Sequence, residues 1–363
     1  MSSDSEIRYR HGAITIAGTT INPGEQATVA IPYGTYSSYE TVHLKAHVRV
    51  SKKPGPTLLV TAGIHGDEVN GTEIVRRLMK EKFIKRMSGT LITIPVINAP
   101  AYSNRSRYMP DRRDLNRLFP GAPSGSLGAR LAHTLCEYIL PHVDLVIDLH
   151  TGTVNRANLP QLRVSPGDKE ANRLAKIFSP PVLLIASIRE GSFRHACSKR
   201  GIPVLLYESG EALRLDTPSI RFALRGIRSV MRELGMISKS STKRFKLQPV
   251  VCKKSLWERA PMGGIFTPLV QLGRAVNQGD TLGFMADPFG DTEIPIIASY
   301  DGILIGRTNE GVADEGDALV HIGFASQQET AEDRIHESAG NFPDLPDEED
   351  DHPVHTDPFA DQL

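Results

Sequence analysis

Cysteine is scarce in this sequence: the chain of 363 residues has three, and none of them is in a C-x-x-C pair. Cys136, Cys197 and Cys252 lie far apart, which argues against a disulfide framework and against a zinc site built from thiolates. We expect all three to be buried thiols. The sequence also lacks a run of about 18 or more apolar residues and an apolar stretch near its N-terminus. These absences predict a cytoplasmic protein with no membrane partner.

Two catalytic motifs are absent as well. The loop PGAPSGSLG at residues 120–128 is rich in glycine but lacks the G-K-[ST] ending of a phosphate-binding loop. No G-x-S-x-G stretch marks a nucleophilic serine. We therefore expect neither a nucleotide site nor a serine hydrolase, and we expect no nucleic-acid partner. The oligomeric state is left open.

Charge is distributed unevenly, although the net charge is zero. Residues 326–363 contain twelve Asp or Glu and one Arg, which leaves 41 Lys and Arg against 30 Asp and Glu in the rest of the chain. So acidic a segment, with few aromatic residues, buries too little apolar surface to offset its ordering entropy. We predict a disordered acidic tail at 326–363. It could simply aid solubility, or it could occupy a cationic cleft of the same chain and inhibit it.

Apolar runs of strand length alternate with helical stretches between about residues 50 and 240. The runs are PTLLVTAG, TLITIPVIN, VDLVIDLH, PVLLIAS and IPVLLYES. Such alternation predicts the α/β class, with a mixed, largely parallel sheet flanked by helices. Apolar residues recur at helical spacing in residues 127–140 and 216–235, where we expect helices. The alternating stretches before residue 50 predict antiparallel edge strands.

The helical signal ends after residue 245. Short strands separated by Gly-Asp and Asp-Gly turns predict a small all-β sandwich domain at residues 246–325. Its turns Gly279-Asp280 and Gly316-Asp317 look like the half-repeats of a biotinyl/lipoyl-type sandwich, but SYDGIL stands where a carrier lysine is expected. We therefore predict a structural or substrate-shaping domain rather than a swinging arm.

Three of the apolar runs end in residues that can bind a metal or exchange a proton. His65 and Glu68 follow PTLLVTAG, His150 ends VDLVIDLH, and Glu208 lies near the end of IPVLLYES. Reactive groups collect at the carboxyl ends of parallel strands. Two histidines and one glutamate, with an open fourth position, are the ligands of a catalytic zinc site. Although an isolated H-x-x-E is often accidental, the combination predicts one zinc ion per chain, bound by His65, Glu68 and His150.

The turn that carries the first two ligands is bordered by glycines. Gly63 and Gly66 allow the backbone to fold tightly enough for an imidazole and a carboxylate to face one point. The other histidines with no partner motif are expected to be ordinary surface or core residues; they are His133, His142, His195 and His321.

The stretches GIHGDEVNG, DLNRLFPG, DLHTG and YESGEALRLD occur in this order. Together they resemble the succinylglutamate desuccinylase/aspartoacylase family of zinc-dependent hydrolases, which are relatives of the zinc carboxypeptidases. The resemblance covers roughly residues 10–325. It implies a zinc carboxypeptidase-like catalytic domain at residues 1–245, with His65, Glu68 and His150 as the zinc ligands and Glu208 as the general base that activates water.

The resemblance also assigns roles in DLNR. It implies that Asn116 and Arg117 bind a substrate carboxylate. It makes Asp114 the partner that fixes the tautomer of a ligand histidine, as such sites generally require. A turn or helix cap is the alternative role for Asp114.

Five arginines lie between positions 105 and 117. By the resemblance Arg107 stabilises the oxyanion, although Arg112 and Arg113 are close enough in sequence to take its place. Guanidinium groups suit carboxylates, whereas a solvated basic loop is the plainer interpretation. We predict an anionic substrate.

These patterns predict a zinc-dependent amidohydrolase that cleaves an N-acyl amino acid, in which zinc lowers the pKa of water and Glu208 moves the proton. The alternative is a carboxypeptidase that removes C-terminal glutamates, because YESGEALRLD looks most like relatives found with ligases that add glutamate to a ribosomal protein. A second alternative is a non-catalytic metal-containing binding protein, which would not need a general base. The sequence does not distinguish a small anionic substrate from a Glu-rich peptide terminus.

Overall fold

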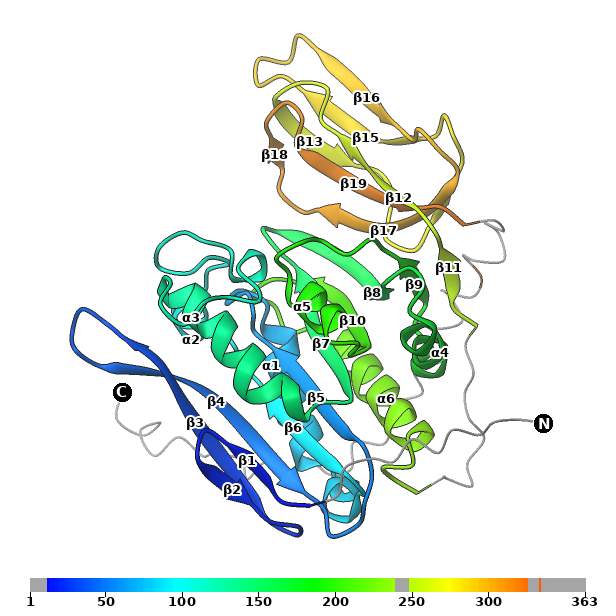
Figure 1. Cartoon of the computed structure of the whole chain (residues 1–363). Coiled ribbons are helices and arrows are strands. Elements are labelled where there is room, and N and C mark those ends of the chain that lie inside the picture. The colour runs from blue at the N-terminus through cyan, green and yellow to red at the C-terminus, as the bar shows by residue number, and fades with distance from the viewer. Residues whose placement is uncertain (1–11, 239–247, 326–332, 334–363) are drawn as a thin grey trace, which may run out of the picture.

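The computed structural model describes residues 12–238, 248–325 and 333. Apart from residue 333, the acidic tail predicted from the sequence lies outside the described residues. Figure 1 shows the arrangement of the helices and strands.

A large mixed sheet forms the centre of the molecule. In the α/β part its strands are β3 (Gln26–Thr35), β4 (Thr41–Val50), β5 (Thr57–Ala62), β6 (Thr90–Ile94), β7 (Leu145–Gly152), β8 (Arg156–Val164), β9 (Val182–Ile185) and β10 (Val204–Glu211). Five later strands continue the sheet, namely β11 (Val250–Cys252), β12 (Ser255–Arg259), β14 (Ala275–Val276), β17 (Gly302–Thr308) and β19 (Ala318–Gly323).

The middle of this sheet is parallel. Strands β10, β7, β5 and β6 lie side by side in that order and run in the same direction. Strand β8 is antiparallel to β10, and β4 and β3 form an antiparallel edge, as expected for the residues before 50. All residues of β5 and β7 are buried, which explains why these segments are apolar throughout rather than alternating. The predicted α/β class is confirmed.

Helices cover both faces of the sheet. Helices α1 (Val69–Lys80), α4 (Lys169–Phe178) and α6 (Thr217–Glu233) share one apolar core with it, whereas α3 (Leu127–Thr134) and α5 (Phe193–Lys199) share another. The short elements α2 (Ala99–Ser103), η1 (Lys82–Arg86) and η2 (Leu115–Arg117) lie in the connections. Among the described residues, no helix combines the length and the apolar character needed to cross a membrane.

One predicted helix differs from its expected form. The segment 127–140 is α-helical only as far as Thr134; a π turn, η3 (Leu135–Ile139), and a 3-10 turn, η4 (Leu140–His142), follow. Pro141 has no N–H to continue the α-helical hydrogen bonds. The wider turn still places Leu135 and Ile139 in the core, so the apolar spacing was correct and the helix type was not.

The strands after residue 250 form a sandwich. A four-stranded sheet of β13 (Gly264–Pro268), β15 (Thr281–Ala286), β16 (Glu293–Ile297) and β18 (Val312–Ala313) faces the last strands of the large sheet. Phe266 and Met285 share a core with Leu304 and Ile322, which lie on the opposite layer. Strand β17 pairs directly with β8 of the α/β part. The large sheet is therefore continuous from β7 and β10 through β8 into the sandwich.

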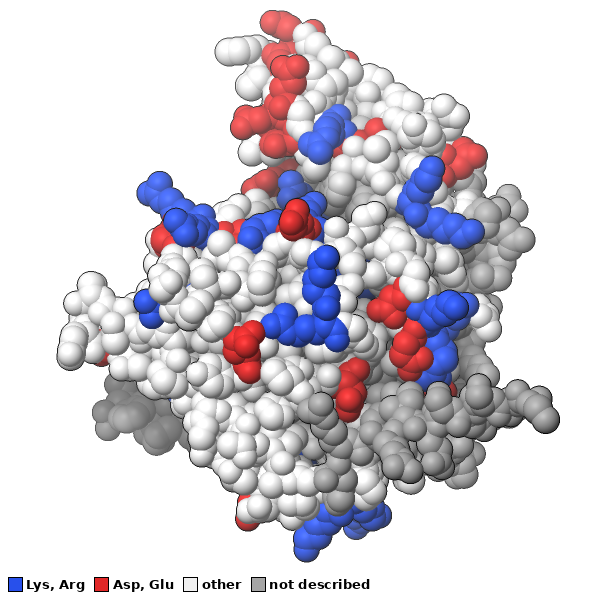
Figure 2. Space-filling view, viewed as in Figure 1, with Lys and Arg blue, Asp and Glu red and all other residues white. Residues whose placement is uncertain are grey.

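Charge is also segregated on the surface. On the face shown in Figure 2, acidic side chains gather along one edge of the sandwich, whereas Lys and Arg lie across the middle of the molecule below it. The hairpin of β1 (Ile14–Ile16) and β2 (Thr19–Ile21) precedes the edge strands at the opposite end of the molecule in Figure 1.

Candidate metal and substrate site

The turn between β5 and α1 brings His65 and Glu68 together. Gly63 has a φ of +63°, in the left-handed region that favours glycine. A Cβ at Gly66 would lie 2.0 Å from the carbonyl carbon of Ala101, so this turn packs directly against the backbone of α2. The two glycines have the role expected from the sequence, and the Nδ1 atom of His65 lies 2.6 Å from Oε1 of Glu68.

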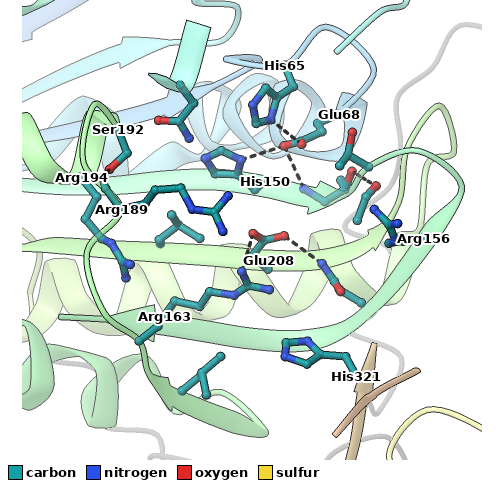
Figure 3. Close-up of a pocket in the computed structure, with 18 of the residues that line it drawn as sticks. His65, Glu68, His150, Arg156, Arg163, Arg189, Ser192, Arg194, Glu208 and His321 are labelled. Atoms are coloured by element: carbon teal, nitrogen blue, oxygen red, sulfur yellow. Dashed lines mark hydrogen bonds and ion pairs between the residues drawn. The ribbon is translucent and has the colours of Figure 1, made fainter. Parts of the chain in front are cut away.

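Strand pairing adds the third member of the cluster. Strand β7 lies between β5 and β10, and His150 of β7 is in register with Glu208 of β10. The Nδ1 atom of His150 lies 2.8 Å from Oε2 of Glu68. Candidate ligand atoms of His65, Glu68 and His150 all lie within 4.8 Å of one another, and the three residues are buried (Figure 3). The structure thus brings together the three residues predicted as metal ligands.

A carboxylate holds the second nitrogen of each histidine. Nε2 of His65 lies 3.2 Å from Oδ1 of Asp114, and Nε2 of His150 lies 2.9 Å from Oδ2 of Asp148. Asp148 is itself fixed by the hydroxyl of Thr61, which donates to Oδ1 at 2.7 Å. These contacts leave both Nδ1 atoms directed at Glu68. In metal sites, a carboxylate on the second ring nitrogen generally fixes the tautomer and the orientation of a ligand histidine.

Sequence reasoning missed Asp148. Its signal was available in DLH, because residues two apart in a strand point to the same face. Asp114, in contrast, was predicted with two alternative roles, and its contacts are those of both. Besides its contact with His65, its side chain accepts from the N–H of Asn116 at 2.8 Å and caps η2.

The electrostatics of the cluster favour positive charge. Burial by itself would raise the pKa of Glu68, but His65 and His150 outweigh burial and hold it below its usual range. Burial would lower the pKa of both histidines, but Glu68 and Asp114 raise that of His65, and Asp148 and Glu68 raise that of His150. A divalent cation bound here would replace the protons, because ligand histidines bind metals in the neutral form. The donor set of two imidazoles and one carboxylate fits catalytic zinc.

Arg107 lies at the edge of this cluster. Its Nη2 donates to Oδ2 of Asp114 at 2.8 Å, and its Nη1 lies 3.3 Å from Nδ1 of His65 and 3.7 Å from Oε1 of Glu68. Arg112 and Arg113, which the sequence left as alternatives, are exposed. Of the three, Arg107 is the one beside the candidate ligands.

Asn116 and Arg117 follow on η2. The side-chain oxygen of Asn116 accepts from the N–H of Phe193 at 2.8 Å, which ties η2 to the start of α5. Nη1 of Arg117 donates to the carbonyl oxygen of Asn116 at 2.5 Å. Its Nη2 lies 3.9 Å from Asp114. Both residues line the same cavity as the histidines.

Glu208 is held from the neighbouring strand β8. Nδ2 of Asn158 donates to its Oε2 at 2.9 Å, and Nη1 of Arg163 lies 3.5 Å from its Oε1. Its side chain is 13% exposed, so it remains in contact with the cavity. Neither Asn158 nor Arg163 carried a signal in the sequence, because their contact with Glu208 depends on the antiparallel pairing of β8 with β10.

One cavity of about 400 Å³ is lined by the three candidate ligands, by Glu208 with Asn158 and Arg163, and by Arg107, Asn116 and Arg117. Its arginines are Arg107, Arg117, Arg156, Arg163, Arg189 and Arg194. Only the first two come from the arginine-rich segment 105–117. The sandwich contributes Ser255, Trp257 and His321. From the sequence we expected His321 to be an ordinary surface or core histidine. It is buried, as a core histidine is, but it also forms part of the cavity wall.

Comparison with known proteins relates this chain to deacylases. Residues 54–234 match the family model described as the succinylglutamate desuccinylase/aspartoacylase catalytic domain. A curated relative, N-alpha-acetyl-L-2,4-diaminobutyric acid deacetylase from Halomonas elongata, is 27% identical over 287 residues, which cover 75% of this chain and 83% of the relative.

Solved structures show the same architecture. A succinylglutamate desuccinylase/aspartoacylase from Rhodobacter sphaeroides superposes with a TM-score of 0.75 at 27% identity, covering 87% of this chain and 97% of its own. The product-bound ectoine utilization protein EutE (DoeB) from Ruegeria pomeroyi gives a TM-score of 0.76 at 23% identity, covering 88% and 97%. The latter likeness concerns the fold alone.

Proposed function

The chain belongs to the succinylglutamate desuccinylase/aspartoacylase family, and on this premise we propose that it is a zinc-dependent hydrolase that removes the acyl group from an N-acyl amino acid. The observation that carries the proposal is the convergence of His65, Glu68 and His150 beside Glu208 in one cavity lined by arginines. A deacylase activity agrees with the curated relative, which is a deacetylase.

His65, Glu68 and His150 would hold the zinc, with Asp114 and Asp148 keeping the two imidazoles oriented. When bound, zinc acts as a Lewis acid and lowers the pKa of a water ligand towards 7. Removing either aspartate would free its histidine to rotate, because no other carboxylate is described at that Nε2 atom.

Glu208 is the proposed proton carrier. Because Asn158 holds Oε2, the carboxylate keeps a fixed orientation, and Oε1 takes the proton of the attacking water. The same oxygen then returns the proton to the amide nitrogen as the C–N bond breaks, so the amine leaves in neutral form. Glu68 could not carry this proton, because both of its carboxylate oxygens contact histidines.

The arginines supply the remaining requirements of the reaction. Arg107 is anchored by Asp114 through Nη2, so its Nη1 stays directed at the cluster and stabilises negative charge on the carbonyl oxygen. Arg117, together with Asn116, binds the carboxylate of the amino acid. We propose on these grounds that the substrate is a small anion.

A hydrolysis screen tests the proposal. Zinc-loaded protein is incubated with N-acyl amino acids and with Glu-terminated peptides, and free amine is measured before and after zinc is removed by a chelator. We expect N-acyl amino acids to be hydrolysed, with activity lost on zinc removal and restored on zinc addition. Hydrolysis of the peptides alone would replace the proposal with the carboxypeptidase, and binding without turnover of any amide would leave a non-catalytic protein.

A further inference from the structure

A second cavity lies at the other edge of the large sheet from the candidate metal ligands. It has a volume of about 370 Å³ and is lined by the end of β4, the residues that follow β4, and η1. These segments precede the parallel strands β5 and β6, which begin in register at Thr57 and Thr90, whereas His65 follows the carboxyl end of β5. Because a strand rises about 3.3 Å per residue, the six residues of β5 separate the two cavities by about 20 Å.

Five cationic side chains line this second cavity, which we call the lysine cavity. They are Arg49, Lys52, Lys53, Lys85 and Arg86, and no acidic residue is among the described residues that line it. All of them except Arg49 are exposed. Figure 1 shows β4 ending at the lower end of the molecule, away from the sandwich, and Figure 2 shows Lys and Arg side chains at that end.

The acidic residues next to these segments in the sequence have other partners. Glu81, directly before η1, lies 2.8 Å from Nη2 of Arg228. Glu25 accepts from the N–H of Asn22 at 2.8 Å. Arg49 donates to the side-chain amide oxygen of Gln26, which is neutral. Within the described ranges, no carboxylate forms an ion pair with any of the five cationic side chains of the lysine cavity.

The backbone holds the two sides of the lysine cavity together. The hydroxyl of Ser51 donates to the carbonyl oxygen of Met87 at 2.6 Å and accepts from the N–H of Lys53 at 3.0 Å. The N–H of Gly89 donates to the carbonyl oxygen of Lys53 at 2.9 Å. The antiparallel pairing of β4 with β6 brings these segments together. The fold therefore fixes positive charge from two distant segments around one space.

The cationic groups suit a ligand with several carboxylates. A lysine ammonium is a compact charge on a flexible stem and imposes no fixed geometry on its partner, unlike a pair of buried guanidinium forks. Exposed ion pairs are individually weak, so that several must form together to hold a ligand. An acidic peptide segment, with one carboxylate per residue, meets this requirement better than a single small anion does.

The chain itself contains such a segment. Residues 326–363 include twelve Asp or Glu and one Arg, and residues 347–351 are all Asp or Glu. The sandwich is described as far as Ala325, which leaves 21 residues, 326–346, before the acidic run. The 22 steps from residue 325 to residue 347 can span at most about 75 Å, which exceeds the diameter of roughly 50 Å of a compact body of this size.

We propose that the lysine cavity binds the acidic residues 347–351 of the same chain. The covalent connection gives the segment an effective concentration of order mM, so that individually weak ion pairs are sufficient. Exposed charges are screened over about 8 Å at physiological ionic strength, and the contact therefore weakens as salt rises. A segment bound in the lysine cavity leaves the cavity of the candidate metal ligands open. This contact is thus not the inhibitory one that the charge distribution of the sequence also allows.

A nitroxide label beside the acidic run tests the proposal in the full chain. The label is attached to His352→Cys, because the three native cysteines are buried. At low ionic strength the label should broaden the backbone amide signals of Ser51 and Met87. The broadening should disappear at 1 M salt, where the screening length is about 3 Å. Absence of broadening at low salt, or broadening confined to residues such as Thr151 and Arg189 in the other cavity, would overturn the proposal.

Charge reversal on both sides of the lysine cavity provides the matched comparison. In Lys53→Glu/Lys85→Glu we expect the label at position 352 to lose its effect on Ser51 and Met87. The control is Lys176→Glu/Lys199→Glu, which changes the net charge equally at exposed lysines of α4 and α5. The broadening should persist in the control. Equal loss in both variants would mean that net charge alone attracts the segment, and would overturn the assignment to this cavity.

Two further measurements distinguish other occupants of the lysine cavity. Spin-labelled chains are mixed with isotope-labelled chains that have no nitroxide. Broadening of Ser51 and Met87 in the latter would show that the segment comes from a second copy, and would overturn binding within one chain. Inorganic phosphate is also titrated at constant ionic strength. Shifts of these amides by phosphate, in a chain whose nitroxide does not broaden them, would assign the cavity to a small anion instead.

Discussion

Asp114 and Asp148 determine which nitrogen of each histidine faces Glu68. Their contacts at 3.2 and 2.9 Å occupy the Nε2 atoms, so both Nδ1 atoms are available to a metal. The two partners are supported differently: Asp148 is buried in a strand and bonded to Thr61, whereas Asp114 lies in a loop and is shared with Arg107. The position of His150 is therefore the more rigid of the two.

This difference leads to a prediction for Asp148→Asn. The amide would weaken the hold on His150 and could favour its wrong tautomer, so zinc affinity should fall about 10- to 100-fold. Competition with a chromophoric chelator measures it. Asp168→Asn is a matched control, since Asp168 caps α4 and asparagine caps helices equally well. Unchanged zinc affinity in Asp148→Asn would show that this contact does not orient a ligand.

At the residue scale, the sequence was sufficient to identify site residues that lie at the carboxyl ends of parallel strands. His65, Glu68, His150 and Glu208 follow apolar runs, and parallel strands bring such positions to one edge. Arg163 and Arg194 could not be identified in this way. Their approach to Glu208 depends on the antiparallel insertion of β8 and on the placement of α5, neither of which a local pattern specifies.

The turn from β5 to α1 is the element on which the candidate metal site depends most. Gly66 lies against the backbone of α2, and its N–H donates to the carbonyl oxygen of Ser106 at 2.9 Å. The loop that carries Arg107 is thereby fixed to the loop that carries His65. Backbone contact of this kind leaves no flexible side chain that could move aside.

We therefore predict that Gly66→Ala disrupts both loops. Its Cβ would lie 2.0 Å from the carbonyl carbon of Ala101, so the free energy of unfolding should fall by about 2 kcal/mol or more and zinc should be lost. Denaturant unfolding and metal analysis test this. Gly311→Ala is the control, because nothing lies within 4 Å of a Cβ at that position. Equal stability and zinc content in the two variants would refute the packing argument.

The helices and strands that were predicted correctly are those whose sequence pattern is decided by the burial of apolar side chains. Fully buried β5 and β7 appear in the sequence as apolar runs, and α6 appears as an apolar stripe. The π turn after Thr134 was not predictable from spacing, because α and π turns place apolar residues on nearly the same face. The order of the strands in the sheet could not be predicted from local sequence patterns either, because it is decided by pairing between segments that are far apart in the sequence.

At the scale of the whole molecule, the sandwich forms part of the wall of the cavity that contains the candidate metal ligands. Pairing of β17 with β8 runs through Asn158, the residue that holds Glu208. The adjacent strands bring Trp257 and His321 to the cavity wall. From the sequence we predicted a structural or substrate-shaping domain. A substrate-shaping role requires side chains at the cavity wall, where Trp257 and His321 lie, and it stays a prediction.

The burial of His321 predicts a pH dependence of stability. Its pKa is about 3 in the folded chain, below the ordinary 6.5. As pH falls, the unfolded chain therefore takes up a proton before the folded chain does. The stabilisation is fully present above about pH 6.5 and decreases from there towards pH 3, by at most about 1.4 kcal/mol per pH unit.

The comparison is between the wild type and His321→Phe, which keeps a ring against Trp257. Between pH 6.5 and 4, the free energy of unfolding of the wild type should fall more steeply than that of the variant. Denaturant titrations at several pH values measure both slopes, and carboxylates common to both proteins cancel in the difference. Parallel curves would mean that His321 is not buried in neutral form.

The central claim is that Glu208 carries the proton while His65, Glu68 and His150 hold zinc, and the turnover of Glu208→Gln at full zinc occupancy tests it most directly. Glu211→Gln, on the same strand but outside the residues that line the cavity, is the matched control. We predict that Glu208→Gln retains one zinc per chain and loses about 100-fold or more in turnover of an N-acyl amino acid. Wild-type turnover in the zinc-loaded variant, or loss of zinc from it, would contradict this account.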